Sequence, residues 1–501
     1  MASVPIFRKE IPYSFSDRDL LDDRSFVAGV WQEKADGSKT FPVEDPSDQK
    51  ILAYVVDSSL DDYKSAIEVA HEAFGTYKKL TPKARSQLLR KWSQQVLESR
   101  DDLAALCTLE LGKTFKESLA AVSYAASCLN WFANLAEEGC GGETIPNSNG
   151  RGKTVILTIR QPVGVVCAIT PWNSPYSGVI KKIAPALAVG CTVVHKPAPE
   201  TPLCAIALAK TFERAGFSPG VYNMLTTSSE RAAEIGDLFS SHPLVRHVTF
   251  TGSTGVGKFL AERCGASLKK VTMELGGNAP FLVFADADLD KAVESLLACK
   301  FTSAGQVCIY ANRILLETSI HDQFVSKLLK AIKDNIRLGS PWAETTTLGP
   351  LYSAKGAEKI QRLLKDAVGK GAKLVTSDVY EDGSSYYPPS VLIDVKPDMQ
   401  ITREEIFGPL ISISTFDTED EGIMFANNVK SGLAGYVFTE NVSRLFRVSE
   451  SLEVGMVGAR TGSISAIEMP FGGIKDSGLG REGSRHALEE YTELKAITLA
   501  L

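Results

Sequence analysis

A cysteine and a glutamate stand out as residues that could do chemistry in this sequence of 501 residues. Cys308 follows the segment SAGQV, and a thiol becomes a nucleophile when positive potential or a nearby base deprotonates it. Glu274 lies between Met273 and Leu275, where partial desolvation raises the pKa of a carboxyl group toward that of a general base. Taken singly, both have structural explanations: Cys308 as a small buried side chain, and Glu274 as a helix cap or a lysine partner.

A glycine-rich segment, VTFTGSTGVGK (248–258), offers backbone N–H groups and a helix N-terminus to an anion. It fits neither standard nucleotide-binding motif. The P-loop pattern GxxxxGK requires Ser or Thr next, to hold Mg²⁺, and the chain has Phe259 there. The dinucleotide pattern GxGxxG fails because Leu260 stands at the third glycine position. A phosphate-binding turn and a tight structural turn both stay open.

Lys196 begins another candidate binding segment, KPAPETP (196–202), directly after an apolar run. A lysine at the carboxyl end of a strand in an open α/β sheet lies where ligands bind, and it can bind ribose hydroxyls or a phosphate. A solvated loop lysine is the alternative. No pair of the six histidines has metal-ligand spacing on a predicted element, so we expect no metal site. A Cys–His protease dyad is possible in principle, but no histidine in the sequence has a distinctive context that supports it.

These residues need elements to position them, and the hydrophobic pattern predicts two α/β sheets that meet near residue 275. Helical spacing begins at residues 59 and 82 and covers 113–138, with Ser59 and Asp62 as a capping-box-like start. Asn149-Gly150 signals a hairpin, and 154–159 alternates as an exposed strand. Short apolar runs then alternate with helical stretches such as 203–215 and 321–336, which predicts parallel βαβ units. The runs are 164–169, 190–194, 247–252, 270–275, 281–284, 313–317, 373–377, 391–394 and 410–415.

Composition limits the class of protein. The hydrophobic class makes up 44% and charged residues 23%, as in ordinary globular proteins. A net charge of −6 argues against a nucleic-acid partner. The uncharged run 161–180 has the length of a membrane span but contains three prolines, so we expect no membrane partner. Nine cysteines without a CxxC pair and the absence of a recognisable leader predict reduced thiols in the cytoplasm.

Taken together, the segments resemble the ordered motifs of aldehyde dehydrogenases over nearly the whole chain. The similar segments are PWNSP (171–175), HKPAPETP (195–202), FTGSTGVG (250–257), MELGGNAP (273–280), GQVC (305–308), EEIFGP (404–409), PFGGIKDSGLGRE (470–482) and YTELK (491–495). The resemblance implies an α/β fold with a Rossmann-like coenzyme domain (1–139 and 163–275), a second α/β catalytic domain (276–475) and a small β oligomerisation arm (140–162 and 483–501). It also implies a homodimer or homotetramer, as an alternating, unpaired arm strand would favour.

The resemblance further implies that an aldehyde is oxidised to a carboxylic acid with NAD, while NADP stays open. Cys308 would attack the aldehyde, Asn173 and the Cys308 N–H would hold the oxyanion, Glu274 would activate the hydrolytic water, and Glu482 would relay its proton. Many NAD-preferring members carry an acidic residue where this chain has Pro199. Without that acid, a 2′-phosphate of the coenzyme is repelled less strongly. The implied coenzyme-binding residues are Ile169, Thr170, Pro171, Trp172, Lys196, Glu200, Gly252, Ser253, Gly276, Glu405 and Phe407.

The chain is most similar to the succinic-semialdehyde dehydrogenase-like branch, but its expected carboxylate clamp is altered. One arginine is replaced by Lys181 and another by Thr302, and Arg460 replaces an asparagine. Lysine loses bidentate geometry, and threonine supplies no charge. With Ser465 as the third expected substrate residue, we predict a neutral aliphatic or aromatic aldehyde, with succinic semialdehyde as the alternative.

Three other functions compete with this prediction. An acylating or ester-hydrolysing member of the family is disfavoured because Glu274 and Glu482 are both present. A catalytically silent binding homologue is disfavoured because Cys308, Glu274 and Asn173 are all intact. A P-loop NTPase is disfavoured by Phe259.

Overall fold

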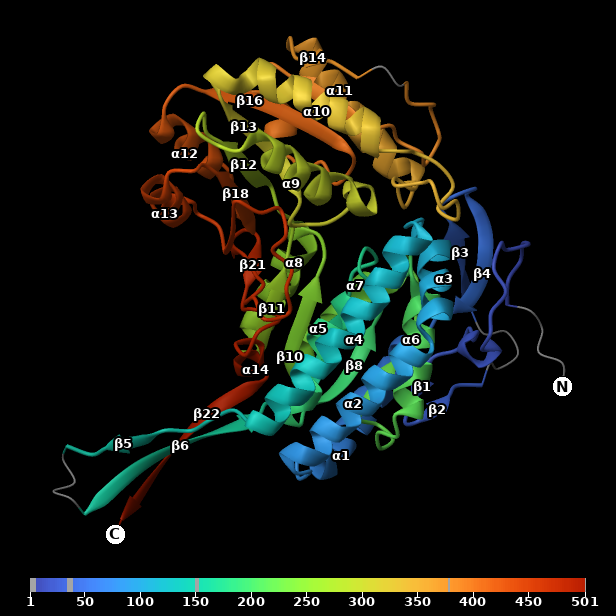
Figure 1. Ribbon diagram of the computed structural model, residues 1–501. Coiled ribbons are helices and arrows are strands. Elements are labelled where there is room, and N and C mark those ends of the chain that lie inside the picture. The colour runs from blue at the N-terminus through green and yellow to red at the C-terminus, as the bar shows by residue number, and fades with distance from the viewer. Residues whose placement is uncertain (1–5, 34–38, 149–152, 377–378, 501) are drawn as a thin grey trace.

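The computed structural model describes residues 6–33, 39–148, 153–376 and 379–500. It consists of two α/β lobes and a β arm that extends away from the first lobe (Figure 1). Within the described residues, no helix is long and apolar enough to cross a membrane.

The first lobe is built on an eight-stranded sheet. Its order is β2 (Val30–Trp31), β1 (Phe26–Val27), β9 (Tyr222–Met224), β8 (Thr192–Lys196), β7 (Val165–Ile169), β10 (Val245–Thr251), β11 (Lys270–Glu274) and β21 (Gly478–Leu479). The five strands from β9 to β11 run parallel. The carboxyl ends of β8, β7, β10 and β11 therefore lie next to one another at one edge of the sheet.

Both faces of this sheet are buried, because successive residues of β7 belong to different cores. Val165 and Cys167 pack in the core that contains residues of α1 (Leu60–Tyr77), α7 (Ala232–Ser241) and α8 (Thr254–Ala266). Val166 and Ala168 pack in the larger core on the other face. That core contains residues of α2 (Pro82–Glu98), α3 (Arg100–Leu111), α4 (Phe115–Glu138), α5 (Ser177–Val189) and α6 (Pro202–Arg214).

The second lobe holds a seven-stranded sheet. Its order is β14 (Lys373–Leu374), β15 (Ser390–Ile393), β16 (Leu410–Phe416), β13 (Ala311–Glu317), β12 (Ala279–Val283), β18 (Ala434–Phe438) and β19 (Met456–Ala459). All neighbouring pairs are parallel except β14 with β15. The helices of this lobe are α9 (Leu289–Phe301), α10 (His321–Asn335), α11 (Ala354–Gly369), α12 (Glu419–Asn427) and α13 (Val442–Ser451).

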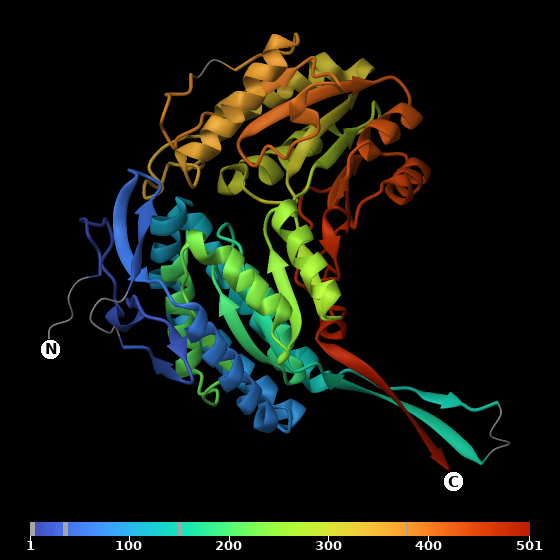
Figure 2. The same ribbon diagram turned by 180° about the vertical axis from the view of Figure 1, so that it is seen from behind.

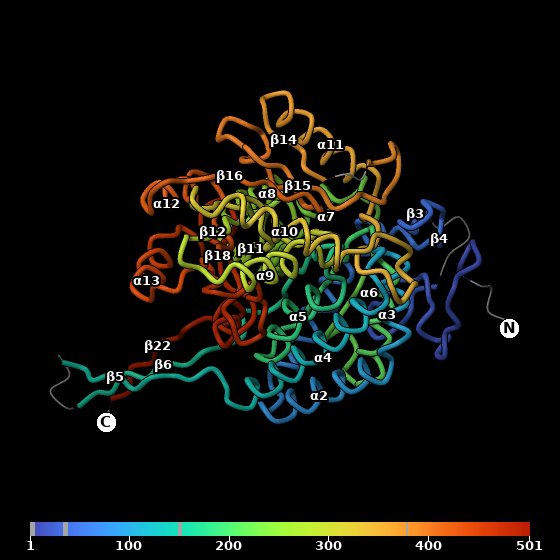
Figure 3. The backbone as a smooth tube through the Cα atoms, turned by 45° about the horizontal axis from the view of Figure 1, so that its top comes forward, coloured from blue at the N-terminus to red at the C-terminus, as the bar shows by residue number. Residues whose placement is uncertain are grey.

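The arm is a three-stranded antiparallel sheet of β22 (Thr492–Ala500), β6 (Thr154–Pro162) and β5 (Thr144–Pro146). Figures 2 and 3 show these strands running outward side by side from the body. After Thr492 every residue of β22 is exposed, including Leu494, Ile497 and Leu499. Smaller elements complete the fold: the hairpin of β3 (Thr40–Asp45) and β4 (Lys50–Val56), the pair β17 (Ser431–Gly432) and β20 (Ile474–Lys475), and α14 (Ala487–Glu490).

The predicted fold class is confirmed, with two α/β sheets, a β arm and the capping box of Ser59 and Asp62. The sequence reasoning missed α3, because every residue from Asp102 to Leu111 is buried and the helix shows no polar face. Of the predicted strand 373–377, the described part, 373–376, forms regular pairing only at Lys373–Leu374, and residue 377 lies outside the described residues. The Asn149-Gly150 turn lies outside the described residues, and the domain boundaries stay a prediction.

Candidate active site

The loops at the carboxyl edge of the first sheet bring the predicted coenzyme residues together. Ile169 ends β7 and is followed by Thr170, Pro171 and Trp172; Lys196 ends β8 and is followed by Glu200; Gly252 and Ser253 join β10 to α8; Gly276 follows β11. This edge of a parallel sheet is where ligands bind in open α/β folds. The second lobe contributes Glu405 and Phe407 from the loop before β16. The Glu405 Oε1 atom accepts a hydrogen bond from the Gly277 N–H at 3.1 Å. The Phe407 ring packs edge-on against the Trp172 ring, with 5.6 Å between the ring centroids.

Several polar groups at this edge suit a dinucleotide. Ser253 is the N-cap residue of α8, yet its side chain makes no capping hydrogen bond, so the hydroxyl and the helix N-terminus are both available to a bound anion. Lys196 is 3% exposed, and among the described residues its ammonium donates only to the neighbouring Pro197 carbonyl, at 3.3 Å. Burial lowers the pKa of Lys196 to about 8, although the charges of Glu200 and Asp57 oppose this. The residues present therefore fit a bound NAD or NADP.

The loop that carries Cys308 is held in a strained conformation. Ser303 and Ala304 have φ angles of 53° and 52°, and Gly305 follows at 75°. Left-handed φ at non-glycine residues persists only where the surroundings enforce it. The Glu117 carboxylate accepts the Ser303 N–H at 2.8 Å, and the Gln306 side-chain oxygen accepts the Tyr352 N–H at 3.0 Å. Contacts from α4 and from the second lobe thus fix the loop that leads to Cys308.

Two donors lie beside Cys308. The Asn173 Nδ2 atom donates to the Gln306 carbonyl at 2.8 Å, which fixes the amide two residues before the thiol. Within the described part of the chain, the N–H of Cys308 makes no hydrogen bond. An oriented amide and a free backbone N–H are the donors of an oxyanion site. The thiol itself is partly exposed, and burial, then the charges of Glu274 and Glu405, raise its pKa, so the resting group is protonated.

Glu274 ends β11 and is only 1% exposed. Neither of its carboxyl oxygens has a hydrogen-bond partner among the described residues. Burial raises its pKa well above the ordinary value, and the negative charge of Glu482 adds to the shift, while Lys182 and Lys181 oppose it. Buried carboxyl oxygens without protein partners indicate a site for ordered water.

Two adjacent buried lysines of α5, Lys181 and Lys182, make different contacts. Lys182 is 0% exposed and forms an ion pair with Glu482; it also donates to the Thr249 hydroxyl at 3.2 Å. Lys181 lies 4.5 Å from the Phe471 ring centroid and 5.3 Å from that of Tyr124. Among the described residues no carboxylate pairs with Lys181 within 4.0 Å. Lys181 is therefore a buried cation that forms no ion pair within the described residues. Burial lowers its pKa, but the neighbouring groups Tyr124, Cys128 and Glu482 raise it above the ordinary value.

The three expected substrate residues have different surroundings. Lys181 contacts the Tyr124 ring, and the Tyr124 hydroxyl donates to the carbonyl of Ser465, so these two residues share a neighbour. Thr302 is exposed, and its hydroxyl donates to the Ala298 carbonyl of its own helix at 2.9 Å. Arg460 is directed to the Thr439 carbonyl at 2.7 Å and to Glu440 at 3.5 Å.

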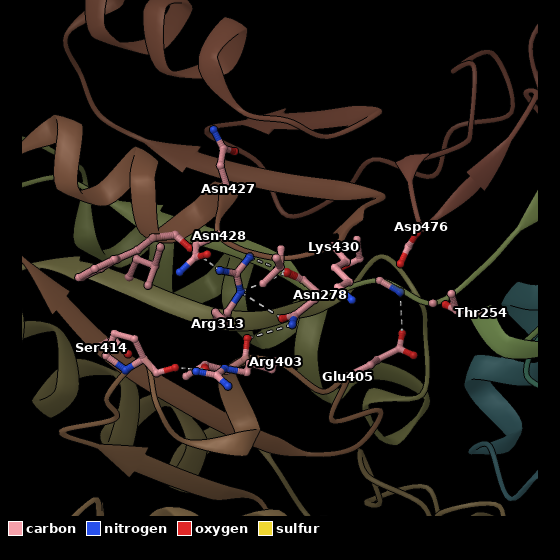
Figure 4. A pocket seen from close by; sticks show the side chains of 18 residues that line it. Thr254, Asn278, Arg313, Arg403, Glu405, Ser414, Asn427, Asn428, Lys430 and Asp476 are labelled. Atoms are coloured by element: carbon pink, nitrogen blue, oxygen red, sulfur yellow. Dashed lines mark hydrogen bonds between the residues drawn. The ribbon is translucent and has the colours of Figure 1, made fainter.

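A cavity of about 650 Å³ opens where the two lobes meet (Figure 4). Gly276 and Glu405 of the expected coenzyme set line it, whereas Cys308 and Lys196 do not. The Glu405 carboxylate points toward the backbone beside Thr254 in this view, and burial raises its pKa to about 7. In the described residues, no cluster of His, Cys, Asp or Glu side chains could hold a metal ion.

Sequence reasoning missed the groups that support the predicted residues: Lys182, Glu117, Gln306, Tyr124 and Phe471. One signal was available. The stretch 177–189 is apolar except for two consecutive lysines, and buried lysines require partners or a function. The other contacts join residues far apart in sequence and leave no local pattern.

Comparisons with known proteins agree with this geometry. Residues 31–497 match the model of the aldehyde dehydrogenase family. A succinate-semialdehyde dehydrogenase [NADP(+)] of Schizosaccharomyces pombe is 46% identical, over 97% of each chain. The human mitochondrial succinate-semialdehyde dehydrogenase is 43% identical, over 95% of this chain and 88% of the human one. The crystal structure of succinate-semialdehyde dehydrogenase from Burkholderia pseudomallei is 40% identical, with a TM-score of 0.94 over 98% of this chain and 100% of that one.

The chain belongs to the aldehyde dehydrogenase family. It is an oxidoreductase that acts on aldehydes with NAD or NADP. The prediction of family, fold and enzyme class made from the ordered motifs is thereby confirmed.

The close passage of Gly277 behind Cys308 gives a testable prediction. A Cβ on Gly277 would lie 2.2 Å from the Cys308 carbonyl oxygen, so Gly277→Ala must displace the nucleophile loop. A displacement of about 1 Å can cost about 100-fold in rate, and we expect kcat/KM for aldehyde oxidation to fall by at least about tenfold.

Gly265→Ala is the matched control, because no atom lies within 4 Å of the added Cβ and the site is an exposed helical position. It should keep full activity and gain up to about 1 kcal/mol of stability. Full activity in Gly277→Ala would contradict the packing described here.

Proposed function

We propose that this aldehyde dehydrogenase oxidises its substrate through a thioester on Cys308. The observation that supports this proposal is the buried carboxyl of Glu274, which has no hydrogen-bond partner among the described residues. After burial, the charge of Glu274 is the largest influence on the pKa of Cys308. No described protein group hydrogen-bonds this carboxyl, whereas a hydrolytic water would supply the missing hydrogen bonds. Asn173 and the free Cys308 N–H supply the complementary donors.

In the first half of the reaction, the Cys308 thiol releases its proton to ordered water, and the sulfur then attacks the aldehyde carbon. The oxygen of the adduct becomes negative, and the Asn173 amide and the Cys308 N–H stabilise it. Each such donor contributes about 3 kcal/mol in acyl-transfer enzymes. The bound coenzyme then supplies the hydride acceptor.

In the second half, a water hydrolyses the thioester. Its oxygen bonds to the acyl carbon, the carbon–sulfur bond breaks with its electrons on sulfur, and Glu274 takes a proton from the water. The carboxylic acid product then leaves, the sulfur takes back a proton from water, and Glu274 is left protonated, as in the resting enzyme. Glu274 must pass this proton on before it acts as the base in the next turnover. Glu482 is the proposed acceptor, since its negative charge contributes to the raised pKa of Glu274.

For the coenzyme, we propose that Ser253 and the N-terminus of α8 hold the phosphates beside Trp172. Lys196 and Glu200 face the adenosine ribose, and Glu405 with Phe407 hold the nicotinamide end. The backbone of the remaining residues lines the coenzyme-binding site; these residues are Ile169, Thr170, Pro171, Gly252 and Gly276. Pro199 carries no charge to repel a 2′-phosphate, so the site accepts NADP as well as NAD.

For the substrate, we propose a short aldehyde with a terminal carboxylate, such as succinate semialdehyde. A buried cation that forms no direct ion pair is costly, and a substrate carboxylate would pair with Lys181. The named activity of the yeast, human and Burkholderia relatives supports the same choice. A neutral aliphatic or aromatic aldehyde is the second candidate, favoured by the uncharged Thr302 and by the rings of Phe471 and Tyr124.

We also propose a homodimer or homotetramer in the cytoplasm. The exposed apolar residues Leu494, Ile497 and Leu499 of β22 would be covered by a partner subunit. All nine cysteines are free thiols, as in a reducing compartment.

Replacing the two central residues separates the half-reactions. With Glu274→Gln, the carboxyl that accepts the proton of water is lost, so one equivalent of NADH or NADPH should form per site and the acyl-enzyme should persist. Cys308→Ala should form neither product. Rapid mixing followed by mass spectrometry of the intact protein measures the adduct directly. Steady turnover by Glu274→Gln without an accumulating adduct would overturn the assignment of the base.

The charge of Lys181 decides between the two substrate classes. Lys181→Met removes the cation, and because a hydrogen bond to a charged group is worth about 1.5–3 kcal/mol, kcat/KM for succinate semialdehyde should fall by about 10- to 100-fold. The value for butanal should stay or rise, and Lys181→Arg should retain activity on succinate semialdehyde.

The comparison uses both aldehydes with each coenzyme, which also gives the NAD to NADP preference. An equal loss on both aldehydes, or a wild type that prefers benzaldehyde, would reject the carboxylate proposal in favour of a neutral substrate.

A further inference from the structure

Several buried polar groups lie close enough to Glu274 for their charges to act on its pKa, Glu482 and Lys182 among them. Lys182, which pairs with Glu482, also donates to the Thr249 hydroxyl on β10 at 3.2 Å. Lys182 and Thr249 are 0% exposed and Glu482 is 4% exposed. These groups therefore form a continuous buried contact from α5 to the centre of the first sheet.

Tyr491 lies at the end of this buried contact. It follows α14, immediately before β22 begins, and it opens the YTELK segment, which has no role in the reaction steps above. Its ring stacks on His247 with 4.7 Å between centroids and 22° between planes. His247 and Thr249 are two residues apart on β10, so both side chains project from the same face of the sheet. Tyr491 is thus placed beside Thr249.

The Tyr491 hydroxyl is a buried polar group with no protein partner. The residue is 1% exposed, and within the described chain neither its hydroxyl nor the His247 Nδ1 atom makes a hydrogen bond. A buried hydroxyl without a partner costs about 1–3 kcal/mol, which an ordered water removes. Burial raises the pKa of Tyr491 well above its ordinary value, the negative charge of Glu482 adds to this, and the nearby Thr249 side chain opposes it.

We propose that the Tyr491 hydroxyl and ordered water extend a proton path from Glu274 through Glu482, Lys182 and Thr249 toward the base of the arm. This inference rests on the proposed thioester hydrolysis, which leaves one proton on Glu274 in each turnover. The hydroxyl accepts a proton on oxygen and releases its own, so it is unchanged at the end of the step. Burial lowers the pKa of His247 to about 3, so the stacked imidazole stays neutral and adds no charge to the path.

The exit of the path lies at residues 489–490. Glu490 is partly exposed and precedes Tyr491, and its side chain accepts the Arg481 N–H at 3.2 Å. The Lys270 ammonium donates to the backbone carbonyls of Glu489 and Thr492 at 3.0 and 2.7 Å. Surface groups that exchange protons with solvent therefore flank Tyr491.

Tyr491→Phe tests this role sharply, because it removes a hydroxyl that makes no protein hydrogen bond. If the residue is only structural, both Tm and rate stay at wild-type values. If the hydroxyl carries the proton, formation of the acyl-enzyme stays unchanged while its breakdown slows by about tenfold or more, with Tm unchanged. Rapid quenching and intact-protein mass spectrometry measure the two rates separately, and the solvent deuterium isotope effect on breakdown should increase.

Tyr77→Phe is the matched control, since Tyr77 is buried in the same lobe and donates to the Leu187 carbonyl at 3.1 Å. It should lower Tm and leave the breakdown rate unchanged. Thr249→Val should reproduce the slow breakdown, and Thr249→Ser should restore the wild-type rate. Wild-type breakdown in both Tyr491→Phe and Thr249→Val overturns the path. A wild-type enzyme that forms no acyl-enzyme instead overturns the proposed function itself.

Discussion

The rest of the site depends on the close packing of Gly276 and Gly277, which lie in the link between the two lobes. A Cβ on Gly277 would lie 2.2 Å from the Cys308 carbonyl oxygen, and one on Gly276 would lie 3.1 Å from the Glu405 carboxylate. β11 ends at Glu274 and β12 begins at Ala279, so this short link joins the two sheets. Only residues without side chains let the backbone run this close. As a result, the carboxyl at the end of β11 and the thiol of the Cys308 loop in the second lobe belong to one site.

Burial sets the electrostatics of this site. The pKa values of Cys308 and Glu274 are both raised, with desolvation as the first cause in each case. Burial therefore disfavours the ionised form of both groups, and the proposed chemistry requires each of them to lose a proton. Lys182 and Lys181 are the cations that oppose the shift at Glu274. The helix α5 thus supplies the charge that the two reacting groups lack.

Sequence reasoning recovered what has a local signature and failed where contacts span the chain. Flanking residues and ordered motifs mark Glu274 and Cys308, and their roles stay a prediction. The amphipathic helix at 59 was predicted from its capping residues, whereas α3 has no polar face to detect. Lys182 escaped notice because its partner Glu482 lies 300 residues away. The bond from Gly277 to Glu405 spans 128 residues, and no spacing in the sequence predicts it.

The protonation state of Glu274 in the resting enzyme is the central physical claim, and infrared spectroscopy measures it directly. The difference spectrum between wild type and Glu274→Gln, recorded at neutral pH without aldehyde or coenzyme, isolates this one carboxyl group. A buried, desolvated Glu274 predicts a protonated carboxyl C=O band that is present in wild type and absent from the variant. A difference spectrum that contains only ionised carboxylate bands would contradict the claim.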